Sequence, residues 1–270
     1  MKIAFLGGGN MATALIGGLI AKGFDARAIA VVELSAPARE RLAARYPVRV
    51  STAPDAALQG ADTLVLAVKP QDMKNALASL ASGIRGKLVI SIAAGVTLDA
   101  LSRWLGGHRD LVRVMPNTPA LIGAGISGLY AFPDVTQEGR KKTETIVSAV
   151  GEFVWLGEER LLDPVTAVSA SGPAYVFWFI EQLAACAERL GIPKEEALKL
   201  ARHTVLGAAQ LAASSGKSPA ELRREVTSKG GTTEAALKVF DEEKMAERFA
   251  RAIEAASRRG AELGRELGKD

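Results

Sequence analysis

The stretch Gly7-Gly8-Gly9-Asn10-Met11-Ala12 has the spacing G-x-G-x-x-A and directly follows an apolar run at residues 3–6. The apolar run predicts a short strand, and the residues after the motif have helical periodicity. In such a unit the first glycine permits a tight turn, the second lets the backbone approach a pyrophosphate, and the small last residue lets the helix pack closely. Amides at the helix N-terminus then bind phosphate. The motif predicts dinucleotide binding, with contacts from Leu6, Gly7, Gly8, Gly9, Asn10 and Met11.

Alternating strands and helices extend this unit to about residue 162. Short runs of apolar and β-branched residues predict strands at residues 3–6, 28–32, 48–50, 63–68, 87–92, 111–114 and 154–156. Strands that alternate with helices at this spacing are typical of parallel strands joined by crossover helices. We therefore expect a Rossmann-like, doubly wound α/β domain over residues 1–160.

From Asp163 onward the apolar period is helical. Asp163 and Pro164 suit a helix start, and Ser218-Pro219-Ala220-Glu221 has the pattern of a capping box. We expect an all-α domain over residues 161–270, with a junction near residues 157–163. Its alanine-rich helices have more apolar face than one small core can cover, which favours burial against a second subunit.

The composition is that of a globular protein and argues against several function classes. The chain of 270 residues is 48% hydrophobic, as in globular proteins. Its 34 basic and 30 acidic residues are interspersed, so the sequence predicts no basic patch for nucleic-acid binding. The apolar run at residues 174–180 is too short to span a membrane. Cys186 is the one cysteine of the sequence, so we expect no internal disulfide. His108 and His203 are its two histidines, and no cysteine or histidine cluster has metal-ligand spacing, so we expect no metal site. A secretory signal peptide needs a continuous hydrophobic region, and glycines interrupt the apolar run at the N-terminus. We therefore expect a cytoplasmic protein.

Glu33 ends the second predicted strand and bears on which dinucleotide binds. A carboxylate there accepts hydrogen bonds from the ribose 2′-hydroxyl of NAD and repels the 2′-phosphate of NADP. Leu34 follows it, while Arg39 and Arg41 lie further on, where either side chain could reach a phosphate or simply be solvated. Glu33 therefore favours tolerance of NADH, and NADPH stays open if Glu33 is merely a solvated loop residue.

Three further loops follow predicted strands, at residues 67–70, 93–96 and 115–119. Ligands bind at the carboxyl ends of strands in open α/β sheets, and small residues with proline suit a backbone wall against a nicotinamide. Ordinary loop chemistry is the alternative for each loop, and Lys69 either neutralises a phosphate or is solvated. The candidate cofactor contacts are Ala67, Val68, Lys69, Pro70, Ala93, Ala94 and Asn117.

Two stretches of the helical half carry small and hydroxyl residues. In Val226-Thr227-Ser228-Lys229-Gly230-Gly231-Thr232-Thr233, two glycines precede threonines at a helix start, which presents free amides and hydroxyls to a small anion. A simple helix cap after a flexible turn is the alternative. Residues 169–175 interrupt a helix with small residues and a proline, which is consistent either with close approach of another chain or a substrate, or with a kink.

Together these motifs resemble the pyrroline-5-carboxylate reductase family across essentially the whole chain. The most specific part is the stretch from Pro219 to Asp241, which contains Gly230-Gly231-Thr232-Thr233. The resemblance implies NAD(P)H-dependent reduction of 1-pyrroline-5-carboxylate to L-proline, the last step of proline biosynthesis. It also implies a homodimer formed by the helical domain, with dimers assembled into a ring-like decamer.

The resemblance assigns roles to residues of the helical half. It implies that backbone amides from Gly231 to Thr233, with the Ser228 hydroxyl, bind the substrate carboxylate, and that the Thr233 hydroxyl contacts the ring nitrogen and relays its proton. Thr233 and Ser228 are thus the implied catalytic residues. The implied substrate contacts are Val226, Gly230, Gly231, Thr232, Thr233 and Glu159.

The residues also fit the chemistry of an imine. Neither histidine lies in a motif, whereas a ketone reduction needs a proton donor aimed at the nascent alkoxide, and a cyclic imine can be protonated on nitrogen before hydride arrives. A hydroxyacid or 6-phosphogluconate-type dehydrogenase is the main enzyme alternative, but it would need a catalytic lysine, and none lies between Asp163 and Glu188. A non-catalytic NAD(P)-binding sensor is the other alternative.

Overall fold

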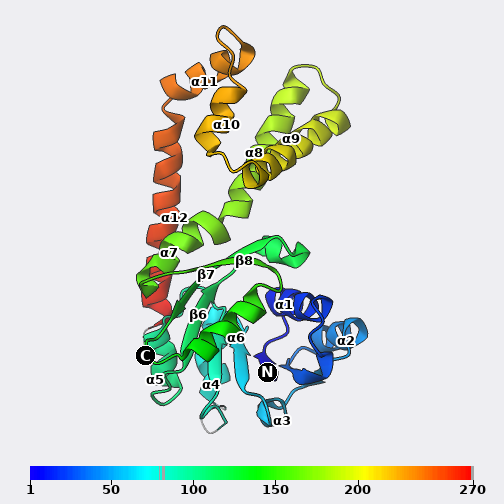
Figure 1. The fold of residues 1–270 in the computed structure, drawn as a ribbon, viewed down its shortest axis with the longest axis vertical. Coiled ribbons are helices and arrows are strands. Elements are labelled where there is room, and N and C mark those ends of the chain that lie inside the picture. Colours follow the sequence, from blue (N-terminus) through cyan, green and yellow to red (C-terminus); the bar gives the residue numbers. More distant parts are fainter. Residues whose placement is uncertain (79, 81–82, 269–270) are drawn as a thin grey trace. The chain divides into compact units, whose positions relative to one another are not determined.

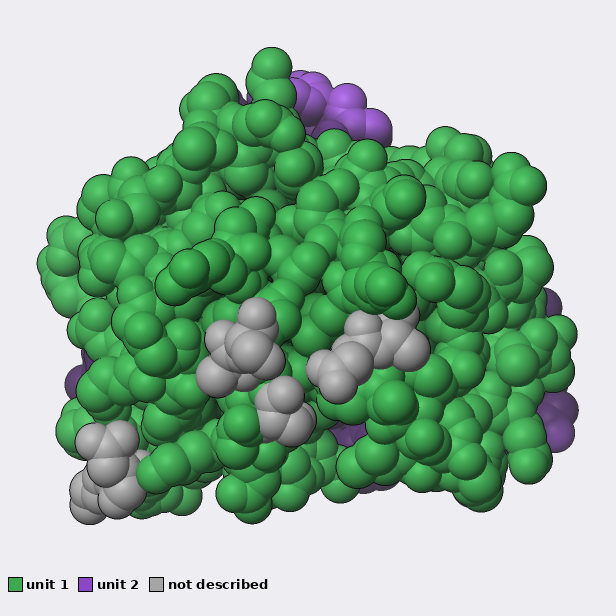
Figure 2. All heavy atoms as spheres, turned by 90° about the horizontal axis from the view of Figure 1, so that it is seen from below, with its two compact units in different colours: residues 1–171, 256–270 green, residues 172–255 purple. Residues whose placement is uncertain are grey.

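The computed structural model describes residues 1–78, 80 and 83–268, and the chain divides into two compact units (Figure 1). Unit 1 comprises Met1–Ser171 and Ala256–Asp270, and unit 2 comprises Gly172–Ala255 (Figure 2). The last helix, α12 (Met245–Leu267), contributes its first part to unit 2 and its end to unit 1.

Unit 1 contains an eight-stranded sheet in the described residues, with strand order β3-β2-β1-β4-β5-β6-β7-β8. This is the doubly wound α/β arrangement that the glycine motif and the alternation predict. The strands are β1 (Ile3–Leu6), β2 (Ile29–Val32), β3 (Arg49–Ser51), β4 (Thr63–Leu66), β5 (Leu88–Ser91), β6 (Leu111–Met115), β7 (Gly125–Ala131) and β8 (Gly151–Trp155).

Two features of the sheet differ from the sequence-based expectation. β7 was not predicted, and it pairs antiparallel with β6, so the sheet is mixed rather than all parallel. β8 begins three residues before the expected strand at 154–156. Glycines at positions 125 and 128 weaken the strand signal of β7, although most of its residues are buried. The short link after Met115 cannot hold a crossover, so the chain turns back on the sheet.

Helices cover the sheet and close one hydrophobic core within unit 1. Every residue of β1, β2, β4, β5 and β6 is buried, and the largest buried side chains include Phe5, Ile16 and Leu64. The helices are α1 (Asn10–Ala21), α2 (Ala36–Arg45), α3 (Pro54–Leu58), α4 (Met73–Ala78), α5 (Leu98–Trp104), α6 (Gln137–Val147) and α7 (Leu162–Val165), with short 3₁₀ helices η1 (Ala26–Ala28), η2 (Pro70–Asp72), η3 (Thr118–Ile122) and η4 (Glu159–Leu161) and a π-helix η5 (Thr166–Ala170).

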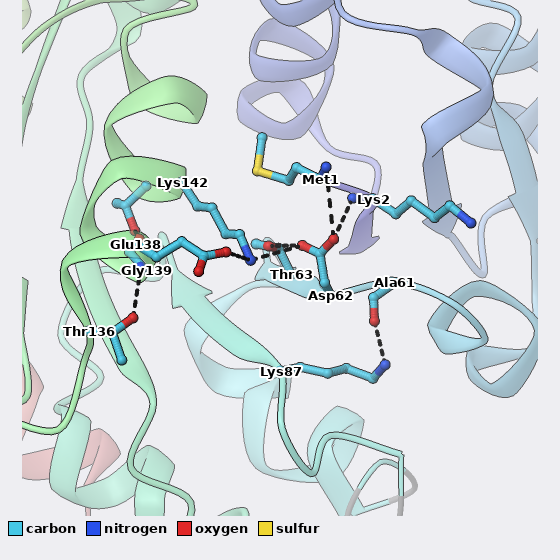
Figure 3. Close-up of polar contacts among 11 residues, drawn as sticks. Met1, Lys2, Ala61, Asp62, Thr63, Lys87, Thr136, Glu138, Gly139 and Lys142 are labelled. Carbon is cyan, nitrogen blue, oxygen red and sulfur yellow. Dashed lines mark hydrogen bonds and ion pairs between the residues drawn. The ribbon is translucent and has the colours of Figure 1, made fainter.

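Asp62 fixes the amino edge of the sheet (Figure 3). Its carboxylate accepts hydrogen bonds from the Lys2 N–H at 2.9 Å and the Thr63 hydroxyl at 2.8 Å. Lys142 of α6 and the Met1 amine lie 3.7 and 4.0 Å from its oxygens. Burial raises the pKa of Asp62, but these hydrogen bonds and positive charges outweigh it and hold the pKa below its ordinary value. The start of β1 is thereby tied to β4 and α6.

Unit 2 is all-helical, as expected. It contains α8 (Gly172–Arg189), α9 (Lys194–Ser214), α10 (Pro219–Glu225), α11 (Thr232–Glu242) and the first part of α12. The expected capping box is present, because Ser218 and Glu221 cap each other at the start of α10. Among the described residues, no helix is long and apolar enough to cross a membrane. Many large apolar side chains of this unit are exposed, including Phe177, Trp178 and Phe249, so one chain leaves wide apolar surfaces uncovered.

Candidate cofactor and substrate sites

The glycine turn after β1 has the shape that a dinucleotide phosphate needs. Gly7 has φ +100°, donates its N–H to the Val32 carbonyl at 2.8 Å, and passes so close to β4 that a Cβ would lie 2.7 Å from the Ala67 carbonyl oxygen. At Gly9, the residue before α1, a Cβ would meet no atom of the described chain within 4 Å. Nor does any described side chain cap α1. The first-turn amides of α1 therefore face open space, which fits a pyrophosphate.

A cavity of about 670 Å³ opens beside this turn, between α1 and α2. Arg41 and Arg45 of α2 are exposed at its wall, and within the described residues neither pairs with a carboxylate. Sequence reasoning did not single out Arg45, although arginines four residues apart on one helix face were a readable signal. The lining residues are Gly8, Gly9, Asn10, Thr13, Ala38, Arg41, Leu42, Ala44 and Arg45.

Glu33 points back at the glycine turn. Its Oε2 accepts a hydrogen bond from the Gly8 N–H at 2.8 Å, and its Oε1 accepts one from the Ser35 N–H at 2.7 Å. Arg39 donates through Nη1 to the carbonyls of Glu33, at 3.1 Å, and Leu34, at 2.7 Å. The negative charge at the end of β2 is thus fixed beside the turn, and Arg39 holds the connection from β2 to α2.

The sheet order brings the other candidate loops to the same edge. β1, β4, β5 and β6 are parallel neighbours, so the loops at residues 67–70 and 93–96 and the one after Met115 emerge beside the glycine turn. Ala93 is buried, Ala67 and Val68 are half-buried, and Lys69 is exposed just before η2. The structure therefore collects all of the residues that the sequence nominated for the cofactor at one edge of unit 1.

Asn117 joins this edge to the π-helix. It is 9% exposed, its Oδ1 accepts a hydrogen bond from the Ile126 N–H at 3.0 Å, and its Nδ2 donates to Ser169 Oγ at 3.4 Å. The π-helix is closed by the Ser171 N–H, which donates to the Thr166 carbonyl at 2.9 Å, and it lies at the start of the stretch where the sequence predicted an interrupted helix. Such turns are frequent at functional sites.

Glu159 is held within unit 1. Its Oε1 accepts hydrogen bonds from Arg113 Nη1 at 3.0 Å and from the Leu98 N–H at 2.8 Å. Arg113 lies on the buried strand β6 and was not singled out from the sequence. A charged residue inside an apolar predicted strand is the signal that would have found it. Contact between Glu159 and the substrate stays a prediction.

The nominated residues of unit 2 form one tight turn before α11. Gly231 precedes the helix, its N–H donates to the Ser228 carbonyl at 3.0 Å, and a Cβ on it would lie 2.5 Å from Ser228 Oγ. The Gly230 N–H donates to Glu234 Oε2 at 2.7 Å. In the described chain no side chain caps α11, so the amides that begin with Thr232 lack an intrahelical partner and suit a carboxylate.

The described residues contain no group of three or more His, Cys, Asp or Glu side chains arranged to hold a metal ion. Cys186 is a free, exposed thiol on α8.

Comparison with known proteins gives two family matches. Residues 159–263 match the model described as pyrroline-5-carboxylate reductase dimerisation, and residues 2–95 match the model described as NADP oxidoreductase coenzyme F420-dependent. The chain is 45% identical to the pyrroline-5-carboxylate reductase of Pseudomonas aeruginosa over 99% of its own length and 98% of the relative's. It is 42% identical to that of Synechocystis sp., with 98% and 99% covered.

Solved structures agree with these matches. A pyrroline-5-carboxylate reductase from Coxiella burnetii superposes with a TM-score of 0.93 at 40% identity, covering 97% of this chain and 98% of the other. The pyrroline carboxylate reductase of Plasmodium falciparum, solved with NADP bound, superposes with a TM-score of 0.85 at 26% identity, covering 98% of each chain.

Proposed function

The chain belongs to the pyrroline-5-carboxylate reductase family, and from that premise we propose which of its residues perform the NAD(P)H-dependent reduction of 1-pyrroline-5-carboxylate to L-proline. One observation carries the proposal: each unit has an uncapped helix start preceded by glycines, at α1 in unit 1 and at α11 in unit 2, among the described residues. The first suits the pyrophosphate of a dinucleotide and the second suits a carboxylate.

The turn before α11 binds the substrate carboxylate. The N–H groups of Gly230 and Gly231 already donate to Glu234 and Ser228, so these glycines shape the turn. The amides of Thr232 and Thr233, with the Ser228 hydroxyl, are left to donate to the carboxylate. Val226 is exposed beside the turn and offers apolar contact to the ring, and Glu159 completes the proposed substrate set.

The Thr233 hydroxyl delivers the proton that the substrate's ring nitrogen needs. When bound, the reduced nicotinamide supplies the hydride, and the protein has to place the imine carbon and keep the ring nitrogen protonated. The Thr233 side chain lies in the first turn of α11 and is half-buried. Its hydroxyl contacts the ring nitrogen and relays to it a proton taken from water, so that the nitrogen is protonated when the hydride reaches the imine carbon. The Ser228 hydroxyl donates to the carboxylate.

Residues at the carboxyl ends of the parallel strands would hold the cofactor. The turn from Leu6 to Met11 would bind its pyrophosphate, the loop at 67–70 would flank that group, and Ala93, Ala94 and Asn117 would contact the nicotinamide. Glu33 stands where the adenosine ribose binds in this fold. Because its carboxylate is fixed by the N–H groups of Gly8 and Ser35, NADH is used at least comparably to NADPH, whose 2′-phosphate it repels.

Unit 2 forms a homodimer, and dimers assemble into a decamer. The exposed apolar side chains of α8 and α12, with the dimerisation family match, support the dimer. The decamer is carried over from the family resemblance. Sedimentation velocity tests it, because a decamer has ten times the 28.3 kDa mass of the chain. A species no larger than a dimer at micromolar concentration would contradict the decamer alone.

The assay that tests the function follows NAD(P)H absorbance at 340 nm with and without added 1-pyrroline-5-carboxylate. Oxidation that depends on the substrate, with L-proline identified by chiral amino-acid analysis, supports the proposal. Binding of NAD(P)H without turnover would indicate a cofactor-binding sensor. Oxidation of a hydroxyacid by NAD(P)⁺ without imine reduction would indicate the dehydrogenase alternative.

A further inference from the structure

The loop after β5 lies against the end of the C-terminal helix, and two glycines meet there. Gly95 has φ +76°, and a Cβ on it would lie 3.1 Å from Leu267 Cδ1 and 3.6 Å from the Gly264 nitrogen. In return, a Cβ on Gly264 would lie 3.3 Å from the Gly95 carbonyl oxygen. The backbone of the loop therefore rests directly on the backbone of the last turns of α12, and side chains on either glycine would separate them.

A second contact fixes the same end of the helix. Arg103 of α5 donates through Nη2 to the Gly268 carbonyl at 2.9 Å, which satisfies a carbonyl at the helix C-terminus. α5 starts right after the loop, where the Leu98 N–H donates to Glu159 at 2.8 Å. Residues 93–98 are thus contacted by α12 at Gly95 and by Glu159 at Leu98.

We propose that residues 263–268, which we name the C-terminal brace, set the position of the loop containing Ala93 and Ala94, and that Gly264 is a positioning residue for hydride transfer. This rests on the proposed function, which places these alanines toward the nicotinamide. The brace is the last part of α12, and it ends against the loop at residues 93–96. Hydride transfer is sensitive to placement, since a shift of about 1 Å can cost roughly 100-fold in rate.

The test compares Gly264→Val with Gly260→Val in the full-length protein. Both substitutions put the same β-branched residue into the same helix, but a Cβ at Gly260 would lie 4.0 Å from its nearest neighbours, atoms of Asp163. We expect Gly264→Val to lower kcat about 10- to 100-fold and to weaken NADH binding, while Gly260→Val changes both far less. Gly264→Ala should shift kcat in the same direction by a smaller factor, although alanine favours the helix.

ADP-ribose separates positioning from loss of structure, because it lacks the nicotinamide. Kd values for NADH and ADP-ribose, measured by calorimetry, should show that Gly264→Val weakens NADH and leaves ADP-ribose unchanged. Equal weakening of both ligands, or a kcat and NADH affinity that match those of Gly260→Val, would overturn the proposal. If Gly264→Val does not fold, the same comparison between Gly264→Ala and Gly260→Ala decides. Failure of the proposed function shows separately, as a wild-type protein that does not reduce the imine.

Discussion

Arg113 Nη1 lies 3.0 Å from Glu159 Oε1, and this ion pair joins β6 to η4, the 3₁₀ helix that precedes α7. The Arg113 side chain is 4% exposed and that of Glu159 is 20% exposed, so water does little to screen the pair. The same Glu159 oxygen accepts the Leu98 N–H at the start of α5. One carboxylate thus links η4 to β6 and to the start of α5, which directly follows the proposed nicotinamide loop.

Removing the cation should therefore destabilise the fold. Arg113→Met leaves Glu159 partly buried without its partner, and we expect the free energy of unfolding to fall by about 3 kcal/mol. Arg113 pairs with two carboxylates, Glu159 at 3.0 Å and Asp163 at 3.9 Å, so adding Glu159→Gln to Arg113→Met removes the closer of the two orphaned charges and should recover part of that loss. Urea unfolding of the two single variants and the double variant measures this cycle. If the losses in free energy of unfolding of the two single variants add up to that of the double variant, Arg113 and Glu159 are not coupled.

Thr233→Ala tests the proposed catalytic hydroxyl. We expect kcat/KM for 1-pyrroline-5-carboxylate to fall about 10- to 100-fold, which corresponds to roughly 1.4 to 2.8 kcal/mol for one hydrogen bond to a charged or reacting group. Thr233→Ser keeps the hydroxyl and should restore most of the activity. Lys238→Ala on the exposed face of the same helix is the control, because it removes only an ion pair to Glu242 at 3.8 Å. Unchanged steady-state kinetics in folded Thr233→Ala would rule the role out.

Glu33→Ser tests cofactor choice. Two unit charges about 4 Å apart repel by up to about 4 kcal/mol at an effective dielectric constant of 20, so removing the carboxylate should raise kcat/KM for NADPH relative to NADH. Glu33→Gln removes the charge and keeps one of the two hydrogen bonds, because its amide oxygen can still accept the N–H of Gly8 while its amide nitrogen cannot accept that of Ser35. Both variants should shift the NADPH/NADH ratio in the same direction. A fixed ratio, or one that moves toward NADH, would show that Glu33 does not face the ribose.

Asp62→Asn tests the amino edge of the sheet through pH. The folded-state pKa of Asp62 is below its ordinary value of 3.8, so its ionised form stabilises the fold above that pH, and the contribution is lost as pH falls through the folded pKa. Asp62→Asn should lower the melting temperature at pH 7, and the difference from wild type should shrink below about pH 4. Thermal unfolding from pH 7 to pH 3 measures this. A pH-independent difference would mean that the charge is not what stabilises this edge.

The sequence by itself determined the class of both halves. The spacing of Gly7, Gly9 and Ala12 and the alternation of strands with helices are local patterns, so they could be read without the fold, and they gave β1 to β6 to within one or two residues at each end. The capping box at Ser218 and the glycines before Thr232 are equally local, since a helix start depends on the few residues around it. The shared location of the candidate cofactor residues also followed, because the carboxyl ends of neighbouring parallel strands lie together, and their contact with a cofactor stays a prediction.

Only the tertiary structure decided the contacts that join distant segments. β7 could not be read from its glycine-containing sequence because its burial against α7, where Val165 packs on Gly128, is not visible in any local period. Arg113 and Glu159 are 46 residues apart, and which carboxylate meets a buried arginine depends on how the strands are ordered. Two further contacts form only when the chain is folded: Glu33 with Gly8, and Gly95 with Gly264. The reason is that hydrogen bonds and packing act between residues that are neighbours in space, whatever their distance in the sequence.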